Sequence, residues 1–162
     1  MQEQMLDYFA AEKAEAALFI AIAAFALALG AWLLWSGHAY RGAAWPLIAI
    51  AVIQIIVGGT VFTRTEGQVA TLQAQLEEAP VEFRAEELDR MATVMQNFRI
   101  YKVIEIVLLA AGIVLSYLFF RHELIYGIAA GLIAQSAIML LLDLFAERRA
   151  DVYITHLQQL PG

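Results

Sequence analysis

The chain has no cysteine among its 162 residues. Disulfide bonds, CxxC redox centres, thiolate metal sites and a cysteine nucleophile are therefore excluded. Charged residues are also scarce, at 16% of the chain, whereas a soluble domain carries about a quarter. This composition excludes an ordinary soluble globular domain.

Basic residues are few as well. Ten lysines and arginines stand against 16 aspartates and glutamates, which gives a net charge of −6. The sequence supplies no basic patch for nucleic-acid phosphates, so nucleic acid is excluded as a partner. The same acidity does not favour anionic lipid headgroups.

Motifs of common enzymes are absent from the sequence. There is no Ser-His-Asp pattern, no glycine-rich phosphate loop, and neither an HExxH nor a GxSxG motif. We therefore expect no catalytic residue and no cofactor, and an enzyme is the less favoured class of protein.

Long apolar runs dominate what the sequence does contain. Hydrophobic residues make up 62% of the chain, and its mean hydropathy is +0.68. Such runs are typical of membrane-spanning helices, whereas an outer-membrane barrel would show segments with a period of two. The sequence predicts an all-α integral membrane protein with four transmembrane helices in an antiparallel bundle. The spans are expected over residues 16–35, 43–62, 99–120 and 124–145, within a single domain of residues 1–162.

Residues 64–97 form the only sizeable polar segment between these spans. Apolar residues recur at helical spacing on both sides of Pro80, which predicts a helical hairpin between spans 2 and 3. Residues 1–15 mix acidic and apolar side chains, so we expect a short interfacial helix before the first span.

The second arm of the hairpin and the third span are expected to form one long helix over Glu82–Phe120. Apolar residues recur along its first half at spacings of three and four. Lys102 and Glu105 continue the same face, and no proline or glycine interrupts the helix before Gly112. Both charged side chains should therefore face protein rather than lipid. The apolar positions are Leu88, Met91, Met95 and Phe98.

The orientation follows from the basic residues, because lysine and arginine favour the cytoplasmic side of a membrane. Only Arg41 and Arg121 lie in the two short turns. We therefore expect both termini and the hairpin on the cytoplasmic side of a cytoplasmic (inner or plasma) membrane. The basic residues on that side are Lys13, Arg64, Arg84, Arg90, Arg99, Lys102, Arg148 and Arg149.

A polar cluster is predicted where spans 2, 3 and 4 meet the cytoplasm. An unpaired charge at this depth is costly, so the charged groups must be paired or wetted. In one interpretation, Lys102 pairs with Glu105, Asp143 pairs with Arg64 or Arg99, and these pairs fix the helix register. In the other, the cluster forms a cytoplasm-facing vestibule for an ion, a proton or a lipid headgroup. Its members are Arg64, Arg99, Lys102, Glu105, Asp143, Glu147 and Arg148.

Three uncharged polar residues lie deeper in the spans. Gln54 and Gln135 can bond to each other between helices or line a water path, and bonding is the favoured interpretation. Ser136 lies on the same helical face as Asp143. The motif Gly127-x-x-x-Gly131 predicts close helix packing on another face.

A metal site is not expected, although the outer turns contain weak candidates. His38, His122 and Glu123 carry suitable ligand atoms, but the spacing within each turn matches no metal motif.

Length and span count are similar to those of small tetraspan families, including the membrane-associated glutathione and eicosanoid enzymes. The characteristic Glu-Arg motif of those enzymes lies within an early span. The one Glu-Arg pair here, Glu147–Arg148, lies at the end of the last span, so their activity is not expected for this chain.

The leading functional hypothesis is a non-enzymatic multi-pass protein that acts through protein–protein contacts. It would be an accessory, regulatory or protective subunit, forming a homo-oligomer or binding a membrane or soluble protein through the hairpin, with membrane lipids around its spans. The alternative is a small oligomeric ion channel or carrier that uses the polar cluster. A membrane enzyme acting on a lipid is the third hypothesis.

Overall fold

Long helices account for nearly all of the described chain. The computed structural model describes residues 1–37 and 39–160, so His38, Pro161 and Gly162 are left out. The predicted all-helical class is confirmed. The elements are α1 (Gln2–Trp35), the 3-10 turn η1 (Arg41–Ala43), α2 (Ala44–Glu78), α3 (Pro80–Leu118) and α4 (Glu123–Gln158).

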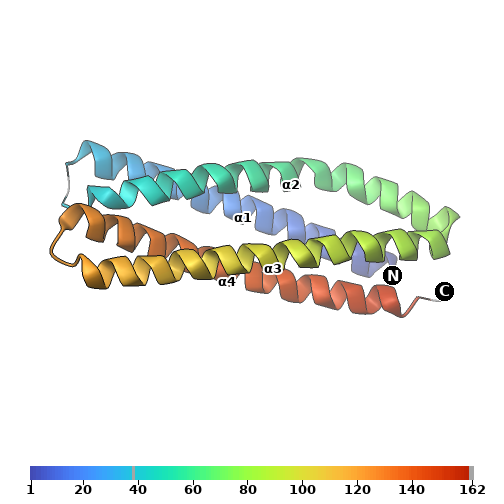
Figure 1. The fold of residues 1–162 in the computed structure, drawn as a ribbon. Coiled ribbons are helices and arrows are strands. Elements are labelled where there is room, and N and C mark those ends of the chain that lie inside the picture. Colours follow the sequence, from blue (N-terminus) through green and yellow to red (C-terminus); the bar gives the residue numbers. More distant parts are fainter. Residues whose placement is uncertain (38, 161–162) are drawn as a thin grey trace.

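The four helices lie lengthwise beside one another, each antiparallel to the one before it (Figure 1). Both termini and the α2–α3 turn lie at one end, and the α1–α2 and α3–α4 connections lie at the other. The most extensive contacts join α1 to α2 and α3 to α4, while α4 also contacts α1 and α2. The chain is therefore two antiparallel helix pairs held together mainly through α4.

The two arms of the expected hairpin are the ends of α2 and α3, and each arm continues its long helix without a break. One residue, Ala79, separates the two helices, and its non-helical conformation (φ −146°, ψ 69°) turns the chain. Pro80 then begins α3 at a position where a helix needs no backbone N–H. Residues 1–15 likewise continue directly into α1 instead of forming a short helix of their own.

Among the described residues, three segments are long and apolar enough to cross a membrane. They are Gln2–Trp35, Arg41–Glu78 and Glu123–Gln158. The span expected within α3 stays a prediction. After Glu105 the uncharged part of α3 runs only from Ile106 to Leu118. This section is roughly 20 Å long at the rise of an α-helix, shorter than the hydrocarbon core of a bilayer, which is about 30 Å thick.

The interior has two parts with different packing. We call residues 1–15, 64–98 and 146–160 the terminal part, and residues 16–37, 39–63 and 99–145 the apolar part. Large side chains fill the core of the terminal part, among them Phe9, Phe83 and Met91. Small residues such as Ala23 and Ala44 line the α1–α2 contact of the apolar part and let these helices approach closely.

The outer surface of the apolar part is strongly apolar. Phe25, Val107 and Phe145 are each at least 60% exposed, and many other large apolar side chains accompany them. Exposed apolar area on this scale marks contact with lipid or with another protein.

Glycines allow the start of α4 to pack against η1 and the start of α2. A Cβ atom at Gly42 would collide with the carbonyl oxygen of Leu124. A Cβ atom at Gly127 would lie 2.8 Å from the carbonyl oxygen of Tyr40, and one at Gly131 would lie 2.8 Å from that of Ala43. Backbone therefore meets backbone at this crossing, and only glycine fits there.

We expect Gly42→Ala to destabilise the protein by about 1–3 kcal/mol, because the α4 backbone must move to admit the methyl group. Thermal unfolding of the detergent-solubilised protein measures this loss. Gly67→Ala is the matched control, since nothing lies within 4 Å of the added atom. Equal stability of the two variants would contradict the close crossing.

Candidate functional site

Charged residues of all four helices gather between the terminal and the apolar part. We call this set the boundary layer. Interhelical ion pairs and buried carboxyl groups make it up. Its residues are Glu12, Lys13 and Glu15 of α1, Arg64 and Glu66 of α2, Lys102 and Glu105 of α3, and Asp143, Glu147 and Arg149 of α4.

The ion pairs of the boundary layer link each helix to a neighbour. Lys13 pairs with Glu66, and Arg64 lies 3.8 Å from Glu12, so α1 is joined twice to α2. Lys102 Nζ donates to Glu147 Oε2 at 2.5 Å and joins α3 to α4. The fourth pair joins α4 to α1, between Arg149 and Glu15.

These partners differ from the predicted ones. Lys102 pairs with Glu147 instead of Glu105, and Arg64 pairs with Glu12 instead of Asp143. A lysine side chain is long and flexible, so Lys102 reaches Glu147, which lies one helical turn beyond Asp143 toward the terminal part. The prediction also missed α1, whose acidic residues had been assigned to an interfacial helix.

The structure does not bring every predicted cluster residue into the layer. Arg99 and Arg148 are exposed on the outside of α3 and α4. Arg149, the neighbour of Arg148, faces α1 and takes part in the layer instead.

Glu105 and Asp143 form the most buried part of the boundary layer. The two residues are 2% and 8% exposed, and their carboxyl groups are close enough to interact across the contact between α3 and α4. Neither oxygen of Glu105 accepts a hydrogen bond from an N–H or hydroxyl group of the described residues. A buried carboxyl group without a donor is unusual and needs a physical explanation.

A strip of uncharged polar groups continues from this pair into the apolar part. Gln135 Nε2 donates to Gln54 Oε1 at 2.6 Å, which joins α4 to α2. Gln54 Nε2 and Ser136 Oγ are buried and have no partner among the described residues. Ser136 precedes Asp143 by two helical turns, roughly 10 Å.

The structure describes two of the three weak metal candidates, His122 and Glu123. His38 lies outside the described residues. His122 precedes α4 with its ring tilted against Phe119, and Glu123 is exposed in the first turn of α4. Within residues 1–37 and 39–160 no three His, Asp or Glu side chains are grouped as a metal site would need.

A second buried polar group lies in the terminal part, and the sequence prediction missed it. Glu87 of α3 is 1% exposed and accepts bonds from Arg90 Nε at 2.6 Å, Arg90 Nη2 at 2.7 Å and Tyr153 Oη at 3.0 Å. The Tyr153 ring stacks on Tyr8 of α1, with ring centroids 4.5 Å apart. We call Glu87, Arg90, Tyr153 and Tyr8 the Glu87 network. It ties α1, α3 and α4 together.

Burial keeps the tyrosines of the Glu87 network protonated. It raises the pKa of Tyr8 to about 12 and holds the pKa of Tyr153 well above its ordinary value. The Tyr153 hydroxyl therefore remains a donor to Glu87 throughout the physiological range. A Glu-x-x-Arg spacing inside the apolar seam of α3 was the signal for this network in the sequence.

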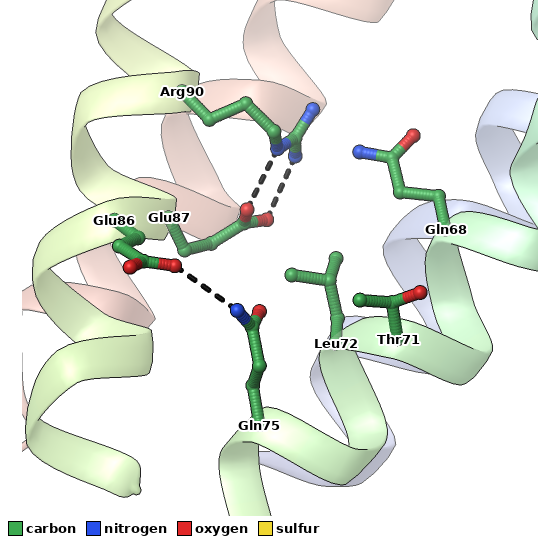
Figure 2. Close-up of a pocket in the computed structure, with 7 residues that line it drawn as sticks. All are labelled: Gln68, Thr71, Leu72, Gln75, Glu86, Glu87 and Arg90. Atoms are coloured by element: carbon green, nitrogen blue, oxygen red, sulfur yellow. Dashed lines mark hydrogen bonds and ion pairs between the residues drawn. The ribbon is translucent and has the colours of Figure 1, made fainter.

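A groove of about 350 Å³ lies beside the Glu87 network, between α2 and α3, and most of its lining residues are of polar type (Figure 2). Gln75 Nε2 donates to Glu86 Oε2 at 3.0 Å across it, and Figure 2 shows Gln68 facing Arg90. Its lining residues are Gln68, Thr71, Leu72, Gln75, Glu86, Glu87 and Arg90. Amide, hydroxyl and charged groups of this kind suit contact with a polar protein segment.

Comparison of the chain with protein families, with curated proteins and with solved structures gives no match. A functional proposal therefore rests on the sequence and the geometry described above.

We expect Tyr153→Phe to destabilise the protein by about 1.5–3 kcal/mol, because the phenol donates to the buried charged carboxylate of Glu87. Thermal unfolding in detergent measures the loss. Tyr101→Phe, at an exposed position of α3, is the matched control and should leave stability unchanged. A similar effect of both substitutions would show that the Glu87 bond contributes nothing.

A double-mutant cycle tests the Lys102 pairing. Lys102→Met and Glu147→Gln should be non-additive by about 1 kcal/mol, because each substitution removes the same ion pair. Lys102→Met combined with Glu105→Gln should show the smaller coupling energy. A larger coupling energy between Lys102 and Glu105 than between Lys102 and Glu147 would instead support the pairing predicted from the sequence.

Proposed function

We propose that this chain is a multi-pass protein of a cytoplasmic membrane, with both termini and the α2–α3 turn in the cytoplasm. The three apolar segments support membrane insertion. The orientation is supported by the basic residues near the termini, against only Arg41 and Arg121 at the opposite end.

In this proposal α3 is the fourth membrane-spanning helix. Its apolar section carries side chains such as Val107, Val114 and Leu118, which are between 54% and 61% exposed and suited to contact lipid. Its charged residues Lys102 and Glu105 face α4 instead, as the cost of charge in lipid requires.

The proposed function is an accessory, regulatory or protective subunit that acts through protein–protein contacts made by the terminal part. One observation carries this proposal: the terminal part has a packed core of its own, with large side chains from all four helices. The Glu87 network adds directional bonds to that core. Membrane crossing alone does not require such a packed body outside the bilayer, whereas a docking surface does.

The partner is a second copy of this chain or another membrane or soluble protein, with lipids around the apolar part. The groove between α2 and α3 is a suitable contact point, because residues of two long helices line it and offer both apolar surface and polar groups. The net charge of −6 argues against nucleic acid.

Native mass spectrometry of the protein extracted in lipid nanodiscs tests the proposal. We expect a complex of fixed stoichiometry, and co-expression of two differently tagged copies separates self-association from a second protein. Thr71→Trp should dissociate the complex because it fills the groove. Thr93→Trp, on the exposed outer side of α3, is the matched control and should not. A monomer without a partner would contradict the proposal.

An oligomeric channel or carrier is the second candidate. The strip of buried polar groups supports it, since Gln54 Nε2, Ser136 Oγ and both Glu105 oxygens are without partners among the described residues. The purified protein in liposomes would then conduct cations or protons, and Glu105→Gln would abolish the flux. Liposomes that stay impermeable at all pH values would exclude this candidate.

A further inference from the structure

Two buried carboxyl groups face each other between α3 and α4. Glu105 is 2% exposed and Asp143 is 8% exposed, and the two carboxyl groups are close enough to interact across the contact between these helices. An ionised carboxylate only accepts hydrogen bonds, so two ionised groups cannot bond to each other. The contact becomes a hydrogen bond when one of the two groups carries a proton.

No cation of the described residues forms an ion pair with Glu105. Neither of its oxygens has a donor there. Lys102 is the closest cation on α3, and its ammonium group is bonded to Glu147 of α4. The charge of Lys102 is shared with Glu147, so it offsets the repulsion between two adjacent negative charges only in part, and such pairs in proteins share a proton.

The remaining charges around the pair do not supply a counter-ion either. From α1, Glu15 is the residue near Asp143, and Arg149 of α4 is bonded to Glu15. The α2 residues Arg64 and Glu66 face their partners on α1. The surroundings of the pair are therefore acidic or already paired.

We propose that Glu105 and Asp143 form a proton-binding site, in which one proton is shared between the two carboxyl groups and bonds α3 to α4. The partly exposed Lys102–Glu147 pair lies between this site and water, and the proton is released along it. After its release two negative charges remain, and their repulsion weakens the contact between α3 and α4. Because α3 is one helix from Pro80 to Leu118, the change also reaches the terminal part. The site thus makes the α3–α4 contact respond to pH, whether or not the protein has a partner.

Infrared difference spectroscopy of the protein in lipid vesicles, between acidic and alkaline buffer, tests the site. We expect a protonated-carboxyl C=O band that is lost in alkaline buffer. Glu105→Gln and Asp143→Asn should each abolish this band, and Glu147→Gln, at the neighbouring ion pair, should leave it unchanged. The proposal is overturned if the band is missing in the unmodified protein or persists in both variants.

Thermal stability gives a second measurement that does not depend on the spectrum. A proton bound only in the folded state stabilises at low pH, and this stabilisation is lost as pH rises through the titration of the site. Burial also raises the pKa of Glu12 and Glu15, which adds a background of the same sign. The Glu105→Gln variant keeps Glu12 and Glu15. The difference in pH dependence between this variant and the unmodified protein therefore reports on Glu105 and Asp143 alone.

The stability of Glu105→Gln should therefore depend less on pH than that of the unmodified protein, because the amide can donate to Asp143 at any pH. Equal pH dependence of the two proteins would refute the proton site. Restoration of alkaline stability by sodium but not by choline, in the unmodified protein alone, would identify a metal cation as the occupant and would also refute it.

Discussion

A helix that carries charge to the edge of an apolar layer needs an opposite charge or a bound proton on the neighbouring helix. The boundary layer meets this constraint with four interhelical ion pairs and one carboxyl pair. Each of the four helices contributes to it, so their relative rotation and register are set at this level. The packing on both sides of the layer depends on that register.

The apolar part and the terminal part, on either side of the boundary layer, are packed in different ways. In the apolar part, alanine and glycine bring the helices close together while large apolar side chains point outward. In the terminal part the pattern is reversed, with Phe9, Phe83 and Met91 inside. Continuous helices connect the two parts, so a change at the boundary layer is transmitted mechanically into the surface proposed for partners.

Periodicity in the sequence was sufficient to predict the helices and the long uninterrupted α3. It also placed Glu105 and Asp143 at a similar depth, because depth follows from the rise per residue. It was not sufficient to pair Lys102 with Glu147, since partners across helices depend on rotation and on the reach of a flexible side chain. The contribution of Glu12 and Glu15 was missed for the same reason, because nothing local shows which helix faces α1.

The helices pass through the boundary layer unbroken and form a packed terminal part. Hydrogen–deuterium exchange of the protein in nanodiscs measures how well the backbone of this part is protected. We expect slow exchange around Leu72, Met91 and Tyr153, close to that of the apolar part, since these residues are buried in the core of the terminal part. Rapid exchange throughout residues 64–97 would show a solvated coil there and would refute a packed terminal part.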